Sequence, residues 1–128
     1  MQEKHLFEYA VIRVVPRVER EEFINAGIIV FCKKQKYLKA RLTLNDSRLK
    51  ALCADTDCAE IKEYLSVIEN VCLGNPATGG PIARLDMPTR FRWLTATRST
   101  VVQSSKVHPG LTDDLDATLE KLHGELVV

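Results

Sequence analysis

The chain has 128 residues, of which 45% are hydrophobic and 27% are charged. These values are typical of one ordinary globular domain, and they exclude a disordered or fibrous protein. The formal net charge of only +1 argues against a nucleic-acid binder that depends on bulk electrostatic attraction.

The sequence shows no targeting segment. Its start, MQEKHLFEYA, lacks the apolar core of a secretory signal, and no apolar run reaches the roughly 18–20 residues of a membrane span. We therefore expect a cytoplasmic protein with no membrane contact, whose cysteines are free thiols in a reducing compartment. Small buried hydrophobes are a better interpretation of these cysteines than zinc ligands, because Cys53 and Cys58 have no second pair and no nearby histidine. The four are Cys32, Cys53, Cys58 and Cys72.

The first 44 residues predict a three-stranded antiparallel meander. Residues 6–15 (LFEYAVIRVV) are apolar on both alternating faces, as in an interior strand covered on both sides. A charged connection over 17–26, long enough for a turn of helix, leads to a second buried strand over 28–32. The four residues 33–36 fit a hairpin loop, and 37–44 then alternate strictly between apolar and polar residues.

Helices and short strands follow in the rest of the chain. A short capped helix is predicted to residue 52, and a longer one begins at the capping pair Asp57 and Glu60 and stops at Gly74. The turn-rich GNPATGGP (74–81) lacks the Lys-Ser/Thr ending of a phosphate-binding loop. The remaining elements are a short strand over 82–85, a short helix over 86–94, a fourth strand over 100–103 and a last helix that opens at 112–114.

These elements predict an α+β fold. We expect a mostly antiparallel sheet of about four strands with two main helices packed on it. No repeat, low-complexity tract or linker divides the chain, so residues 1–128 are predicted to form a single domain. The exposed edges of a small antiparallel sheet also make a homodimer an expectation worth testing.

Charge is unevenly distributed in the second half of the chain. The basic segment (82–110) carries a net charge of +4, while residues 111–128 carry a net charge of −4. Two interpretations stay open: the acidic last helix folds back and neutralises the basic segment, or the arginines and hydroxyls face an acidic or phosphate-bearing partner. The cations of the basic segment are Arg84, Arg90, Arg92, Arg98 and Lys106, opposed only by Asp86.

Three features of the basic segment are candidates for function. Thr97 to Thr100 form its densest cluster of donors, with Arg98, Ser99 and Thr100 able to bind an anion, although such clusters also bond their own backbone in turns. Ser104, Ser105 and His108 suggest a hydrolase, but the sequence around them lacks a nucleophile elbow and their spacing rarely joins a nucleophile to its base. Trp93 is predicted to fill the core with Phe91 and Leu94, although base stacking is an alternative.

Arg13 is a charge inside an otherwise buried strand. A deep arginine needs a partner, and Glu8, Glu22 and the C-terminal acids are the candidates for an internal ion pair. Arg17 and Asn25 flank the connection that follows and would share a polar site with Arg13 if the first two strands are neighbours. His5 and His123 are interpreted as surface residues. No acid or histidine spacing predicts a metal site, and we expect no cofactor.

Four strings carry a family resemblance along nearly the whole chain: YAVIRVVPR, REEFINxG, FRWLTxxRST and Q(S/P)SxVHxG. With them the chain resembles the bacterial domain-of-unknown-function family numbered three thousand and thirty-seven. The resemblance implies genes that often lie beside a gene for a HipA-like kinase, the toxin of a persistence module, and hence a possible kinase partner. It assigns no roles to the motif positions, which are Arg13, Arg17, Asn25, Gly27, Arg92, Trp93, Arg98, Ser99, Thr100 and His108.

Three functions are consistent with these residues, and the first is favoured because the usual marks of an enzyme are missing. One is a non-catalytic binding or regulatory module, an antitoxin-like partner of a HipA-like kinase. The second is a small enzyme or binder that acts on a phosphorylated small molecule or nucleotide. The third is a nucleic-acid-binding protein. The candidate residues for binding an anion or partner are Arg13, Arg17, Asn25, Arg90, Arg92, Arg98, Ser99, Thr100 and His108.

Overall fold

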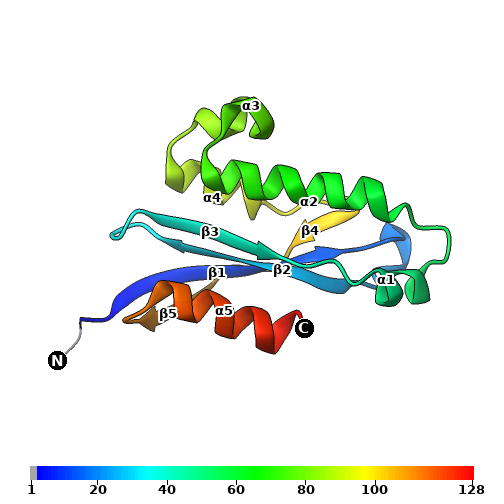
Figure 1. Ribbon diagram of the computed structural model, residues 1–128, viewed down its shortest axis with the longest axis horizontal. Helices are drawn as coiled ribbons and strands as arrows, with labels where there is room; N and C mark the ends of the chain where they lie inside the picture. The colour runs from blue at the N-terminus through cyan, green and yellow to red at the C-terminus, as the bar shows by residue number, and fades with distance from the viewer. Residues whose placement is uncertain (1–2) are drawn as a thin grey trace.

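The fold is an antiparallel sheet with helices on both faces (Figure 1). The computed structural model describes residues 3–128. Five strands form the sheet in the order β3-β2-β1-β4, and β5 also pairs with β1. The α+β class and the mostly antiparallel sheet are therefore confirmed, with five strands where about four were expected. The strands are β1 (His5–Val14), β2 (Ile24–Cys32), β3 (Tyr37–Leu42), β4 (Val102–Ser104) and β5 (His108–Thr112).

Four of the helices begin at an Asn or Asp side chain that accepts a hydrogen bond from a backbone N–H three residues on. Helices α2, α3 and α4 lie on one face of the sheet, and α5 lies on the other (Figure 1). The two main predicted helices therefore sandwich the sheet. The helices are α1 (Asp46–Leu52), α2 (Cys58–Leu73), α3 (Pro76–Gly79), α4 (Met87–Leu94) and α5 (Leu115–Leu126), with 3-10 turns η1 (Val18–Arg20) and η2 (Pro81–Arg84).

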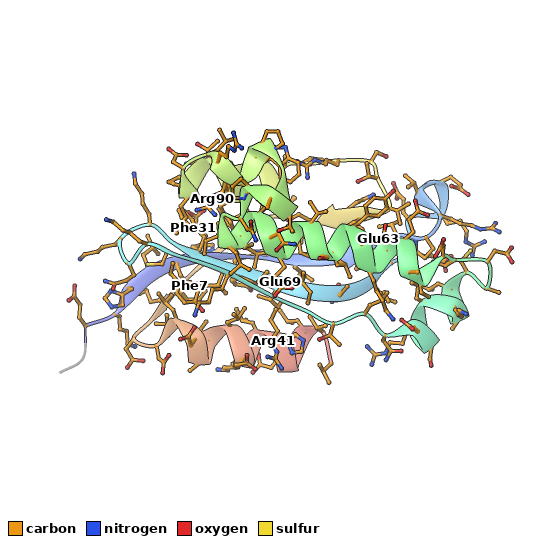
Figure 2. All side chains as sticks on the ribbon, turned by 45° about the horizontal axis from the view of Figure 1, so that its top comes forward. Phe7, Phe31, Arg41, Glu63, Glu69 and Arg90 are labelled. Atoms are coloured by element: carbon orange, nitrogen blue, oxygen red, sulfur yellow. The ribbon has the colours of Figure 1, made fainter. Side chains whose placement is uncertain are left out.

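Two apolar clusters occupy the two faces of the sheet. Strand β2 is buried from Ala26 to Cys32 because its alternate side chains serve both clusters. On the α2 side the rings of Phe31 and Phe91 stack with centroids 4.8 Å apart, and on the α5 side Phe7 packs with Leu119. Figure 2 shows Phe31 toward α2 and Phe7 toward α5.

Strands β4 and β5 run along the same side of β1 and are separated by an interruption at Ser105. The Ser105 N–H donates to the Val11 carbonyl at 2.8 Å, and the Val11 N–H donates to the Ser105 hydroxyl oxygen, also at 2.8 Å. A side-chain oxygen thus takes a position that a backbone carbonyl would fill in a regular ladder. Sequence reasoning missed β5 because its five residues include Pro109 and Gly110, which are depleted in strands.

Other local predictions need correction. Residues 82–85 were expected to form a strand, but Pro81–Arg84 is a 3-10 turn, since the proline at its start favours helical backbone angles. Strand β2 begins at Ile24, four residues before the predicted start. The last helix begins after Asp114, whose side chain caps it. None of the helices within residues 3–128 is long and apolar enough to cross a membrane.

His123 was expected at the surface, and that prediction is wrong. It is buried on the inner face of α5, where its Nε2 shares a hydrogen bond of 2.9 Å with the Thr43 hydroxyl. The residue lies four positions after Leu119, which is also buried, so both face the sheet. The helical spacing from Leu119 would have predicted this.

Candidate functional site

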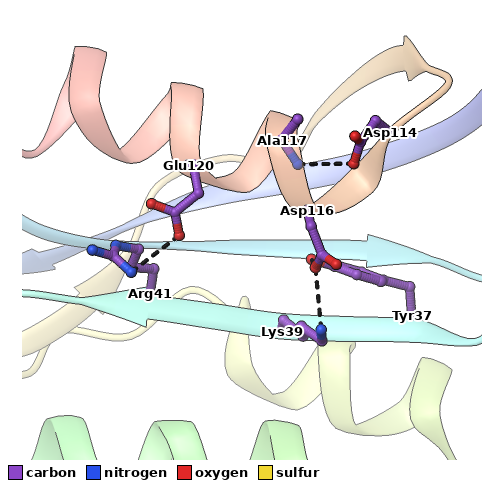
Figure 3. Close-up of polar contacts among 7 residues, drawn as sticks. All are labelled: Tyr37, Lys39, Arg41, Asp114, Asp116, Ala117 and Glu120. Carbon is purple, nitrogen blue, oxygen red and sulfur yellow. Dashed lines mark hydrogen bonds and ion pairs between the residues drawn. The ribbon is translucent and has the colours of Figure 1, made fainter.

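The acidic last helix forms its ion pairs with β3 and not with the basic segment (82–110). Figure 3 shows these contacts with β3. Lys39 pairs with Asp116 at 3.1 Å, and Arg41 pairs with Glu120 at 3.0 Å. The Tyr37 hydroxyl donates to Asp116 at 2.7 Å. Because α5 and α4 lie on opposite faces of the sheet, the first interpretation of the charge asymmetry is wrong.

This contact predicts that the attachment of α5 depends on pH. Hydrogen bonds from Tyr37 and Lys39 hold the pKa of Asp116 below its ordinary value of 3.8. The folded-state pKa is the lower one, so the contribution to stability is present above pH 3.8 and is lost as the pH falls through the folded-state value. We expect the urea midpoints of the wild type and Asp116→Asn to differ at about pH 5 and to converge toward about pH 2. A gap that stays constant across this range would contradict the prediction.

The four cations of the basic segment that are not buried have no acidic partner among residues 3–128. Across residues 3–128, no ion pair involves Arg84, Arg92, Arg98 or Lys106. Arg84, Arg92 and Lys106 are exposed and Arg98 is half-buried. No acidic side chain of the described residues therefore neutralises these four cations.

Arg90 differs from the other arginines of the segment because it is buried. Its side chain is 9% exposed, and its Nη1 donates to the carbonyls of Val71 and Cys72 at 2.7 and 2.9 Å. These carbonyls belong to the last turn of α2, where a cation is favoured. Arg90 therefore caps α2 and is not part of the outward-facing surface for which it was a candidate.

A groove of about 620 Å³ lies between α2, α4 and β4. We call it the α2–β4 groove. Its walls are mainly apolar, and three of its large hydrophobic residues remain exposed: Tyr64 by 48%, Val67 by 40% and Trp93 by 36%. Trp93 was expected in the core, and that prediction is wrong. Phe91 and Leu94 are buried as expected.

Arg98 packs directly on Trp93 in this groove. Its guanidinium lies 4.4 Å from the centroid of the indole ring, and its Nη2 donates to the Trp93 carbonyl. Stacking of this kind fixes a guanidinium while leaving donors free for a carboxylate or phosphate. Ser99 and Thr100 line the same groove, but the Thr100 hydroxyl donates to the Val102 carbonyl. Of the proposed donor cluster, Arg98 is thus the strongest candidate to bind an anion.

Arg13 lies away from this groove. Its neighbours Ile12 and Val14 belong to the α2-side cluster, so its own side chain points to the α5 face. Its guanidinium lies 4.3 Å from the centroid of the Phe23 ring. No ion pair within residues 3–128 involves Arg13, so the expected carboxylate partner is not found there.

Asn25 is the register partner of Arg13 on β2, which agrees with the prediction that the first two strands are neighbours. Its Nδ2 donates to the carbonyl of Leu126 at 2.9 Å and so anchors the end of α5. Arg17 is exposed beyond the end of β1 and contacts Cys53. Arg13 and Asn25 therefore come together, but on the opposite side of the sheet from Arg98.

The serines and the histidine of the hydrolase hypothesis are held apart. Ser104 pairs with Ile12, whereas His108 pairs with Tyr9 and packs its ring 5.3 Å from the Tyr9 ring. Ser105 is buried, and its hydroxyl is bonded to the backbone of Val11 and Lys106. Neither serine shares a hydrogen bond with the His108 ring in the described chain, so the geometry does not assemble a nucleophile and base.

The cysteines and acidic residues of the described chain form neither a catalytic site nor a metal site. Burial raises the pKa of Cys72 to about 12, so this thiol is inert. Hydrogen bonds from Thr56 and then Arg17 lower the pKa of Cys53, which stands alone at the end of α1. Within residues 3–128, no group of three or more His, Cys, Asp or Glu residues is placed to hold a metal ion.

A family profile described as "Protein of unknown function (DUF3037)" matches residues 9–127. The chain belongs to the DUF3037 family. The resemblance seen in its sequence strings is thereby confirmed. No curated protein and no solved structure shows a match to the chain. The matched range includes every residue that lines the α2–β4 groove.

Sequence reasoning missed the α2 wall of this DUF3037 groove. The helical spacing of Ile61, Tyr64 and Leu65 in the sequence predicts that Tyr64 belongs to the apolar stripe that packs on the sheet, and Val67 lies outside that spacing. The buried residues of α2 are Ile61, Leu65, Val71 and Cys72. Helical spacing places Val67 just beside that stripe, which is the signal that would have found it, but it places Tyr64 within the stripe. The exposure of Tyr64 is therefore a tertiary feature that the spacing does not predict.

Proposed function

We propose that this DUF3037 chain is a non-catalytic binding module whose α2–β4 groove takes a segment of a partner protein. The observation that carries the proposal is the stack of Arg98 on Trp93 beside the exposed Tyr64 and Val67. Exposed apolar residues scattered singly need no explanation, but apolar residues gathered in a groove are typical of an interaction site. Tryptophan and arginine are also the residues most enriched among those that dominate binding energy.

The chemistry of the groove supports binding more than catalysis. Of the residues that line it in the described chain, only Tyr64 and Arg98 are ionisable. The hydroxyls of Ser99 and Ser104 therefore have no general base beside them in the groove. An apolar side chain flanked by a carboxylate is the ligand that matches these walls, because no acidic side chain within residues 3–128 pairs with Arg98.

A HipA-like kinase is the first partner to test, because the family resemblance implies neighbouring genes. This choice rests on that resemblance, whereas the groove rests on its own geometry. We expect the chain and the kinase of the same genome to elute as one complex after co-expression. Separate elution at micromolar concentration would exclude the kinase as the partner. A pull-down with the tagged chain in its native host, repeated with a groove variant, would then identify the protein whose binding requires the groove.

Two groove variants test the site itself. Trp93→Ala and Arg98→Ala are each expected to weaken the complex at least about tenfold, because each removes one member of the stacked pair. Arg84→Ala is the matched control, since Arg84 is an exposed arginine of the same segment that does not line the groove. Isothermal titration of the purified chains gives the affinities. Equal losses for Arg98→Ala and Arg84→Ala, with no loss for Trp93→Ala, would reduce the effect to net charge and contradict the proposed site.

The other two functions have less support. A phosphate binder that uses Arg98 with Arg13 or His108 would need residues from both faces of the sheet, since those two lie on the α5 side with Asn25 and Tyr9. A nucleic-acid surface that uses Arg90, Arg92 and Arg98 would need Arg90, which is buried against α2. Arg98 alone would serve either function through the groove.

A further inference from the structure

Strand β4 has a free edge whose backbone groups follow from the register of the sheet. Bonds from Val15 N–H to the Val101 carbonyl and from Ser105 N–H to the Val11 carbonyl fix the bonded positions of the β1–β4 ladder. Because such positions alternate in an antiparallel pair, Gln103 is bonded to Arg13 between them. The N–H and C=O groups of Val102 and Ser104 therefore point away from β1. The Val102 carbonyl also accepts a hydrogen bond from the Thr100 hydroxyl at 2.8 Å, which leaves it one lone pair for a further donor.

The α2–β4 groove runs along this edge. All the residues from Val101 to Ser104 line it, together with Tyr64 and Val67 of α2. The side chains of Val102 and Ser104 lie on the same face of the sheet as Ile12 and Val14, which is the α2 face. An extended segment placed beside β4 would thus direct every second side chain toward Tyr64, Val67 and Trp93.

The outer strands β3 and β5 carry features that oppose pairing with a further strand, whereas β4 does not. Edge strands are commonly protected by charged side chains, by proline or by a covering element. Strand β3 carries Lys39 and Arg41, and its charges are paired with α5. Strand β5 contains Pro109. Strand β4 has the sequence VQS and carries neither a charge nor a proline.

Charge complementarity selects the occupant of this edge. Residues 98–106 hold Arg98 and Lys106 and no acid. In an antiparallel pairing of two copies that sets Val102 opposite itself, Arg98 would lie opposite Lys106 of the second copy, and these like charges would repel. A partner segment with a carboxylate near Arg98 avoids this repulsion and would form a charge-assisted hydrogen bond.

We propose that the partner segment binds as an added antiparallel strand on β4, with alternate apolar side chains in the groove and an acidic side chain on Arg98. The inference rests on the proposed function and specifies how the partner binds. The segment pairs its backbone with the N–H and C=O groups of Val102 and Ser104 that point away from β1. A segment bound in this way has its affinity from main-chain bonds and its specificity from the groove and Arg98.

The test uses random ten-residue peptides displayed on phage and selected on the immobilised full chain. We expect selected peptides to share alternate apolar residues and one acid, and to lose at least about tenfold in affinity when that acid becomes an amide. Each backbone N–H of a selected synthetic peptide is then methylated in turn. Strand addition predicts that methylation weakens binding at every second position only, because alternate N–H groups face β4.

Variants of Ser104 provide the matched test on the protein side. Ser104→Pro removes an N–H that points away from β1, a position where an edge strand tolerates proline, and Ser104→Ala keeps that N–H. We expect Ser104→Pro to bind the selected peptide at least about tenfold more weakly than Ser104→Ala. The methylation scan uses the wild-type chain, so it decides the question even if Ser104→Pro does not fold.

The outcomes separate the two proposals. If Trp93→Ala and Arg98→Ala abolish peptide binding but Ser104→Pro matches Ser104→Ala and methylation shows no alternation, the groove function stands and strand addition is overturned. If the selected peptides bind Trp93→Ala and Arg98→Ala as they bind the wild type, or if selection yields no binder, the proposed function fails and strand addition fails with it. Self-association in sedimentation experiments that Ser104→Pro abolishes would assign the edge to a second copy and overturn the partner segment.

Discussion

Replacing Arg90 by methionine is expected to lower the free energy of unfolding by about 3 kcal/mol. The two bonds from its Nη1 to the carbonyls of Val71 and Cys72 would be lost, and these helix-terminal acceptors would lose a nearby cation. Methionine keeps the apolar stem of the side chain, so the change isolates the guanidinium. Because the buried Nε of Arg90 has no partner in the described chain, the net loss is smaller than two full charge-assisted bonds.

Urea unfolding followed by circular dichroism measures this loss. Arg92→Met is the matched control, because Arg92 is exposed on the same helix and forms no ion pair within residues 3–128. Its free energy of unfolding is expected to stay within about 0.5 kcal/mol of the wild type. Equal midpoints for Arg90→Met and Arg92→Met would show that Arg90 does not cap α2.

Replacing Gly27 by alanine is expected to destabilise the fold by about 2 kcal/mol. A methyl group at this position of β2 would lie 2.2 Å from the Cδ2 of Leu42 and 3.0 Å from the carbonyl oxygen of Arg41. The Cδ2 of Leu42 is the end of a flexible side chain, but the backbone of β3 is held by its ladder with β2. The strain therefore falls on the pairing of these two strands.

The same substitution at Gly124 is expected to have the opposite sign. Gly124 lies within α5, and no atom approaches within 4 Å of an added methyl group. Alanine there raises helix propensity and should stabilise the protein by about 0.5–1 kcal/mol. Thermal unfolding of the two alanine variants beside the wild type tests both expectations together. Equal shifts of the same sign would mean that the close approach at Gly27 is absorbed without strain.

Local patterns predicted the elements whose periodicity or capping is complete. The alternation of residues 37–44 and the Asp57–Gly74 helix pattern both correspond to elements of the fold. Strand β5 was not predicted, because the segment HPGLT forms a strand through its pairing with β1 and not through its own composition. The burial of Arg90 was equally out of reach, because it depends on α4 packing beside the end of α2.

The candidate site was predicted in part. Within the basic segment, Phe91, Trp93 and Leu94 were all predicted to fill the core, and the structure separates them. In a helix, Trp93 stands 200° around the axis from Phe91, whereas Leu94 stands three positions on and shares the face of Phe91. Helix geometry thus explains why Phe91 and Leu94 are buried while Trp93 is left for the groove. Trp93 lies in the same groove as Tyr64 and Val67 only because α4 packs near α2. This is a tertiary arrangement, which a local sequence pattern does not predict.

The most direct test of the groove uses Trp93 itself, because it is the single tryptophan of the chain. Labelling the chain with 5-fluorotryptophan places one fluorine probe in the groove, and tryptophans of an unlabelled partner remain silent. Binding of the partner in the groove predicts that the fluorine resonance shifts as the complex saturates, and that the resonance of Arg98→Ala shifts only at higher partner concentration. A saturated complex in which the Trp93 resonance keeps its position would contradict the groove as the binding site.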